Sequence, residues 1–227
     1  MSIKFHPSIE LLLRYAAGDL CPAYRNTIAM HIKFCRGCEQ LVNEFEALGG
    51  QTLELADNKA MQTSFEDLMA RIDEPETIEA PEIIAEEGRN HDITDVDQIL
   101  YFAQQQKSNK DWKKVTSKIS DFKLAIDDPR YRSRLIHIKA GTKVPSHSHM
   151  GEEVTVVLKG SFKDAYGTYQ PGDFIKRSGD EQHAPEALTD CICFAITDAR
   201  LDYQGFFGPV INWLNDRFER KHYGSVQ

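Results

Sequence analysis

Apolar side chains recur every three or four residues through the first 72 positions of the chain, which is the spacing of amphipathic α-helices. Proline near a helix start and glycine past its end mark the expected boundaries. These signals predict a first helix from Pro7 and Ser8 to Gly18, a second from Pro22 to a break at Arg36 and Gly37, and a third from Cys38 to Gly49 and Gly50. A fourth helical segment holds Met61, Phe65, Leu68, Met69 and Ile72. The fourth helix has its own apolar stripe and no partner in the bundle, so it needs a groove elsewhere.

The C-terminal half follows the period of β-strands instead. Residues 134–139 and 153–159 alternate side chains of different polarity, as strands with one buried face do. In the second segment Val154, Val156 and Leu158 are expected on one face. Short antiparallel strands with frequent turns predict a sandwich or a barrel. The turn signals stand at Gly141, Gly160, Gly167, Pro171, Gly172, Ser178 and Gly179.

An acidic segment separates these two halves. Residues 73–97 hold ten acidic side chains against the single base Arg89, so the segment carries a net charge of −9. Together with two prolines and a glycine, this charge predicts an extended, self-repelling linker. The chain is therefore expected to be a multi-domain α + β protein with a helical arm over residues 1–72, the linker over 73–97 and a β-rich body over 98–227.

Composition restricts the classes of function. The net charge of the chain is −8, which argues against direct nucleic-acid binding through neutralisation of phosphates. The chain starts without an apolar signal region, and no apolar run is long enough to span a bilayer, so no membrane partner is expected. Five cysteines do not make a complete disulfide framework, and a reducing cytoplasm is the natural setting for thiolates that bind metal.

The arm contains a set of side chains with the spacing of metal ligands. His31 and Cys35 are four residues apart and share one helix face, and a break at Gly37 lets Cys38 turn back toward them. His6, at the foot of the first helix, can supply a fourth ligand. Two imidazoles and two thiolates suit tetrahedral Zn²⁺ and leave no open position, so this zinc would be structural. The alternative is that the cysteines are small core residues and His31 is a satisfied surface histidine.

The body contains a second set of candidate ligands. His147 and His149 are two residues apart on a strand and face the same way, and Glu153 returns from the next strand. The run Gly141-x5-His147-x-His149-x3-Glu153-x6-Gly160 resembles the first cupin motif, and His183 stands at the register of the second. The resemblance implies a cupin β-barrel or jelly roll whose metal ligands are His147, His149, Glu153 and His183. Zn²⁺, Fe²⁺, Mn²⁺ and Ni²⁺ all suit this set, and the alternative is four polar barrel residues without a metal.

Two further cysteines lie near the end of the predicted body. Cys191 and Cys193 alternate with Ile192, Phe194 and Ile196 on a predicted strand, so the two thiols take the other face. If that face is the barrel interior, the thiols would be redox-active neighbours of the metal. The simpler interpretation is that both are small buried hydrophobic residues.

Taken together, the two ligand sets point to a known family. His6 and the His31-x3-Cys35-x2-Cys38 motif resemble the zinc-containing anti-sigma domain, a three-helix bundle with a detached fourth helix. The resemblance implies that residues 58–72 are this fourth helix. Joined by an acidic linker to a cupin, this domain resembles the ChrR family of anti-sigma factors. The resemblance implies that the arm sequesters an extracytoplasmic-function sigma factor from core RNA polymerase. It further implies that the cupin is needed for the response to singlet oxygen or organic hydroperoxides. The protein would then have no catalytic residues, and a protease acting on the complex is a possible further partner.

A cupin metalloenzyme is the competing hypothesis. Histidine and carboxylate ligands with open positions suit O₂ chemistry, so the body could be dioxygenase-like with a zinc-stapled accessory domain. The sequence offers no clear extra acid, base or nucleophile beside the ligands. That lack favours the anti-sigma interpretation over an enzyme.

Overall fold

The computed structural model of the 227-residue chain describes residues 3–55, 69, 96–105, 112–149, 151–179, 181–198 and 201–203. Apart from Met69, the predicted fourth helix over 58–72 lies outside these residues, as does the acidic segment up to residue 95. By contacts, Met1–Glu46 and Asn90–Gln227 form one compact unit, and Ala47–Arg89 a second. The N-terminal helices thus pack with the β-rich body, which the hydrophobic pattern did not predict. The division of the chain at residues 72 and 97 stays a prediction.

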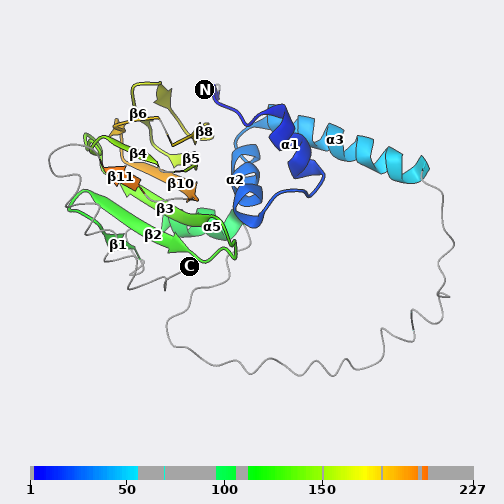
Figure 1. Ribbon diagram of the computed structural model, residues 1–227, viewed down its shortest axis with the longest axis horizontal. Helices are drawn as coiled ribbons and strands as arrows, with labels where there is room; N and C mark the ends of the chain where they lie inside the picture. Colours follow the sequence, from blue (N-terminus) through cyan, green and yellow to red (C-terminus); the bar gives the residue numbers. More distant parts are fainter. Residues whose placement is uncertain are drawn as a thin grey trace. The chain divides into compact units, whose positions relative to one another are not determined.

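The helices of the described part are α1 (Ile9–Ala16), α2 (Pro22–Ile32), α3 (Arg36–Leu55) and α5 (Val96–Gln104) (Figure 1). The predicted starts of the first two helices are confirmed. The Ser8 hydroxyl accepts a hydrogen bond from the Leu11 N–H at 3.3 Å, and Pro22 occupies the first turn of α2. The predicted end is confirmed too, because Gly18 follows α1 with φ 72°, the left-handed conformation in which helices commonly end.

The third helix differs from the prediction at both ends. The chain breaks at residues 33–35, not at Gly37, which lies inside the first turn of α3. At the other end α3 continues through Gly49 and Gly50 to Leu55. A glycine inside a helix costs only about 1 kcal/mol relative to alanine, so two of them do not force an end.

Helix α5 was not predicted from the sequence, because it begins inside the acidic segment. Its Ile99 is fully buried, and the Phe102 ring stacks on Phe122 of the body at 5.2 Å between centroids. The Trp112 indole N–H donates to the Phe102 carbonyl at 3.3 Å. Lys33 pairs with Asp97 across 3.0 Å, which places α5 beside the end of α2. Burial of one apolar stripe therefore outweighs the local charge.

The body is built from short antiparallel strands arranged in three sheets. The six-stranded sheet has the order β1-β2-β3-β10-β5-β8, and smaller sheets pair β11 with β4 and β6 with both β7 and β9 (Figure 1). Among the described residues the predicted barrel is therefore not one closed sheet. The architecture is nevertheless cupin-like, so the predicted class of a helical N-terminal region with a cupin-like β body is confirmed. The strands are β1 (Lys113–Lys114), β2 (Ile119–Leu124), β3 (Arg132–Ile138), β4 (His147–His149), β5 (Glu153–Lys159), β6 (Phe162–Lys163), β7 (Thr168–Tyr169), β8 (Phe174–Arg177), β9 (Glu186–Ala187), β10 (Cys191–Thr197) and β11 (Leu201–Tyr203).

Strand β10 lies inside the large sheet and is buried along its whole length, because both of its faces are covered. One face, with Phe194 and Ile196, belongs to a core shared with α2 and α5. The opposite face, with Cys191 and Cys193, belongs to a second core inside the body. The predicted alternation along this strand is confirmed. The face with Phe194 and Ile196 is the surface on which the N-terminal helices dock.

Candidate metal centres

The four predicted ligands of the arm come together in the structure. His6 precedes α1, His31 lies in the last turn of α2, Cys35 falls in the break, and Cys38 is in the first turn of α3. Their ligand atoms all lie within 4.8 Å of one another. The His6 Nδ1 atom is 3.5 Å from the Cys35 sulfur and 3.4 Å from the Cys38 sulfur. Within the described ranges this is the one group of that kind.

The surroundings of His31 leave its Nε2 atom available to a metal ion. Its ring is fully buried, and its Nδ1 atom lies 2.6 Å from the Gly172 carbonyl oxygen. A carbonyl only accepts, so Nδ1 carries the proton and the lone pair resides on Nε2. That buried Nε2 atom has no hydrogen-bond partner among the described residues. Burial lowers the pKa of His31 to about 4, so the ring is neutral at pH 7 and its Nε2 is available to a cation.

The two thiols of the cluster favour a bound cation as well. Burial, together with the neighbouring Cys35, raises the pKa of the Cys38 thiol to about 12. The Cys38 thiol therefore keeps its proton unless a positive charge lies beside it. A coordinated Zn²⁺ supplies that charge and deprotonates the thiols, so the donor set fits zinc.

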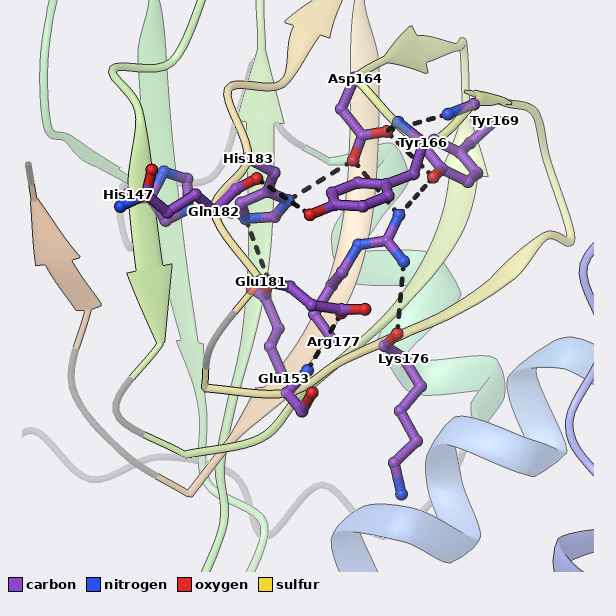
Figure 2. Close-up of polar contacts among 12 residues, drawn as sticks. His147, Glu153, Asp164, Tyr166, Tyr169, Lys176, Arg177, Glu181, Gln182 and His183 are labelled. Atoms are coloured by element: carbon purple, nitrogen blue, oxygen red, sulfur yellow. Dashed lines mark hydrogen bonds and ion pairs between the residues drawn. The ribbon is translucent and has the colours of Figure 1, made fainter.

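In the body, the structure brings two of the predicted ligands into contact. His147 in β4 and His183 form an antiparallel bridge, with each backbone N–H bonded to the other's carbonyl at 3.0 Å. Their Nε2 atoms are 3.0 Å apart, and Glu153 Oε2 is 4.0 Å from the Nε2 atom of His183 (Figure 2). His149 ends β4, but its side chain lies outside the described part of the structure.

The second nitrogen of each ring fixes its tautomer. His147 Nδ1 lies 2.8 Å from the Pro145 carbonyl, and His183 Nδ1 lies 3.5 Å from Asp164 Oδ2. Both partners only accept hydrogen bonds, so both Nδ1 atoms carry protons, and in its neutral form each ring turns an Nε2 lone pair toward the other. Two facing lone pairs repel each other unless a proton or a metal ion lies between them. The geometry is thus suited to a cation near Glu153.

Asp164 orients this site, and the sequence analysis missed it. Its side chain is 1% exposed and lies against His183, the Tyr169 hydroxyl and the Arg177 guanidinium, which is 3.4 Å from Oδ2 (Figure 2). Burial alone raises the pKa of this carboxyl. Hydrogen bonds from His183, from the backbone N–H of Tyr166 and from Tyr169, together with the charge of Arg177, outweigh burial and lower the pKa to about 2. Asp164 is therefore ionised at pH 7. A turn at Gly167 was the only local signal, and it does not indicate the contact with His183.

Cys191 and Cys193 share the face opposite Phe194, as the alternation predicted, and this face belongs to the core inside the body. Their sulfur atoms are 3.6 Å apart and both side chains are buried. The hydrogen bond between the two thiols, followed by burial, raises the pKa of Cys193 well above its ordinary value. A thiol that keeps its proton is a poor nucleophile, so the geometry favours the simpler interpretation of two buried apolar residues.

The fold and the two clusters define a class of protein. Facing imidazoles and a carboxylate in a body of antiparallel strands are typical of cupin-like proteins, and this one carries a helical His/Cys cluster at its N-terminal end. The chain belongs to the family of the ChrR cupin-like domain, which it matches over residues 87–200.

Similarity to known proteins covers the helical arm as well as the body. The anti-sigma-E factor ChrR of Cereibacter sphaeroides is 29% identical over 214 residues, which are 93% of this chain and 97% of the relative. The crystal structure of Rhodobacter sphaeroides SigE in complex with the anti-sigma ChrR matches with a TM-score of 0.67 and 27% identity, over 87% of this chain and 100% of that one. An acetylacetone dioxygenase of Acinetobacter johnsonii matches over 44% of this chain and 76% of its own, at 16% identity and a TM-score of 0.40, a likeness too low to bear on function.

The described residues contain no helix that is both long and apolar enough to cross a bilayer. Two helices of the arm, α1 and α3, expose large apolar side chains. Ile9 and Leu13 of α1 are 67% and 47% exposed, and they stand four residues apart on one helix face. Leu48 and Leu55 of α3 are 59% and 88% exposed and stand seven residues apart, which is again one face. Such stripes are typical of surfaces that pack against another protein.

Proposed function

We propose that this protein is an anti-sigma factor whose arm sequesters an extracytoplasmic-function sigma factor from core RNA polymerase. The observation that carries the proposal is the extent of the match to the anti-sigma-E factor ChrR, 93% of this chain and 97% of that protein, because it includes the arm and not only the cupin-like body. The exposed stripes of α1 and α3 supply apolar surface for such a partner. The net charge of −8 favours a protein partner over nucleic acid, and the cytoplasm is the compartment in which this partner works.

Zinc at the arm cluster has a structural role in this proposal. His6, His31, Cys35 and Cys38 fill all four tetrahedral positions, which leaves none for a substrate. The ion would fix the angle between α2 and α3 at their break. The surface that α1 and α3 offer to sigma depends on that angle.

The body is the part that responds to a signal in this proposal, through a second divalent metal held by His147, His149, Glu153 and His183. The facing Nε2 atoms and the nearby carboxylate support such a site, and zinc or another transition metal suits the donors. We propose no catalytic turnover for it. Oxidants such as singlet oxygen or an organic hydroperoxide are the proposed signal, and they release sigma only if they favour the free state over the bound one. A protease that attacks the released form would make the change irreversible.

Sigma binding is tested with tagged protein purified from its native host. We expect an extracytoplasmic-function sigma factor to co-purify, and the purified pair to block transcription by core polymerase in vitro. Leu48→Glu/Leu55→Glu should weaken binding at least tenfold, because it places two charges on an apolar docking face. Leu188→Glu is the matched control, since that leucine of the body is also exposed, at 43%. Absence of any sigma factor from the purified material, with transcription unaffected, would remove the basis of this proposal.

Metal content provides a second test. Freshly purified protein should contain close to two metal equivalents per chain, because two separate donor sets are present. His147→Ala/His183→Ala should lower the value by one and leave the zinc of the arm in place. His137→Ala is the control, because His137 is a buried histidine of β3 outside both sets. A wild-type content of one equivalent or less would contradict the second site.

A further inference from the structure

A turn of the body holds the N-terminal segment of the arm. Residues 170–173 connect β7 to β8, whose first residue is Phe174. The Asp173 carboxylate accepts hydrogen bonds from the Lys4 N–H at 2.9 Å and the Phe5 N–H at 3.2 Å. The Phe174 N–H in turn donates to the Phe5 carbonyl at 2.9 Å. Asp173 is fully buried. These bonds fix the backbone immediately before His6, which is one of the four arm ligands.

The same turn also supports a second ligand. The Gly172 carbonyl accepts the Nδ1 proton of His31 at 2.6 Å, and the Phe174 ring meets the His31 ring edge to face, with centroids 6.1 Å apart. Hydrogen bonds of this kind set the orientation of a ligating imidazole and raise its basicity. Both histidines of the cluster thus rest on the body, whereas Cys35 and Cys38 are held by the arm itself.

The approach of the turn to the arm is close enough to require glycine. Gly172 has φ 91°, and a Cβ at this position would come within 2.6 Å of the Phe34 Cβ and the Ile3 Cδ1 atoms. Phe34 is the residue before Cys35, in the break between α2 and α3. Ile3 can move the end of its side chain, but the Phe34 Cβ moves only with the backbone of the arm. Any side chain at position 172 therefore pushes on the cluster.

We propose that the β7–β8 turn of the body is the outer support of the arm's metal cluster, so that metal binding by the arm and docking of the arm on the body are one coupled equilibrium. The inference rests on the metal proposed for that cluster. If the turn strengthens metal binding by some factor, thermodynamic reciprocity requires the metal to strengthen docking by the same factor. A change in the body that moves this turn then alters the metal affinity of the arm, without any contact between the signal and the arm.

The experiment uses full-length protein loaded with Co²⁺, since thiolate-to-cobalt absorption reports the Cys35 and Cys38 cluster and not a site of histidine and carboxylate. Gly172→Ala should speed extraction of this cobalt by a chelator roughly tenfold or more, as loss of outer support does at other metal sites. Gly141→Ala is the matched control, because Gly141 also has a positive φ, 71°, but a Cβ there meets nothing within 4 Å. The control should stay within about twofold of the wild type, because only the push on the arm distinguishes the two changes.

A second pair of variants replaces aspartates and leaves Gly172 and Gly141, with their positive φ, unchanged. Asp173→Ala removes the acceptor for Lys4 and Phe5, and it should also speed extraction. Asp128→Ala is its control, because the Asp128 carboxylate likewise bonds the arm, from the Ala23 N–H at 3.0 Å, but away from the ligands. Asp128 also accepts hydrogen bonds within its own turn, as Asp173 does from the Gln170 N–H. If Gly172→Ala does not fold, this pair decides the question.

The reciprocal measurement is amide hydrogen exchange in the metal-loaded and metal-free wild type. Removal of the metal should speed exchange at Phe174, whose N–H bonds the arm, by about the same factor that the variants show. Exchange at Phe194, inside the large sheet, should change far less. Absence of the thiolate bands in wild-type protein would overturn the arm site itself. If the bands are present but each variant loses cobalt at the same rate as its control, the coupling alone is overturned.

Discussion

Cys35→Ser/Cys38→Ser is expected to remove one metal equivalent, unfold the arm and abolish inhibition of sigma-dependent transcription. The arm has few fully buried apolar side chains of its own, among them Leu12, Ile28 and Met30. Structural zinc contributes about 10–16 kcal/mol in small zinc-binding peptides, and most of that is folding free energy. Serine hydroxyls at the two positions do not replace thiolates as zinc ligands, so the angle at the break between α2 and α3 is no longer fixed.

The measurement combines zinc content, helical circular dichroism and a sigma-dependent reporter. Cys21→Ser is the control, because Cys21 is a half-buried cysteine of the arm that belongs to neither donor set. It should retain two metal equivalents and full inhibition. If the double variant stays folded and still inhibits, zinc does not organise the arm, and packing against the body alone is sufficient.

Phe194→Ala is expected to lower the free energy of unfolding by about 3–5 kcal/mol, the range for removal of a buried phenylalanine ring. Phe194 is fully buried inside the six-stranded sheet, and its ring belongs to the core that β10 shares with α2 and α5. That loss is a large part of the roughly 5–15 kcal/mol by which a typical domain is stable. Since the core is shared, the helices and the sheet should lose stability together.

Urea unfolding followed by two probes provides the measurement. Helical circular dichroism reports mainly the arm. In a Trp213→Phe background, fluorescence of Trp112, which packs on Phe122, reports the body. Both midpoints should fall together. Leu188→Ala, at an exposed position, should change the free energy of unfolding by no more than about 0.5 kcal/mol. Two separate transitions, with only the body affected, would indicate that the arm does not depend on this core.

Local signals were sufficient for much of the fold and for the membership of the arm cluster. Helix starts at Ser8 and Pro22 follow from capping and proline chemistry, which act within a few residues. The spacing of His31, Cys35 and Cys38 brings three ligands together over a single helix break, so nearby sequence is enough to predict them. The contact of His147 with His183 required a family motif, because 36 residues separate them.

What the sequence did not predict depends on contacts between distant segments. Asp164 and Gly172 look like ordinary turn residues, and their roles beside His183 and His31 arise only when strands pair. Helix α5 begins in an acidic run, and only the apolar surface of the sheet explains why it is ordered. The alternating pattern of a strand does not tell whether one face or both faces are covered, because that depends on what packs against the strand. For this reason the sequence of β10 did not predict that the arm docks on it.

The distance in sequence between the arm cluster and its outer support has a consequence during protein synthesis. His31 and Gly172 are 141 residues apart, and the ribosome adds roughly 5–20 residues per second, so the support follows the ligand by on the order of ten seconds. In that interval the nascent arm can acquire zinc only through its own four side chains. If the cluster binds zinc and the turn supports it, as we propose, a chain still being translated would hold zinc less tightly than a finished one. Zinc-poor cells should then fail first in loading zinc onto the arms of nascent chains.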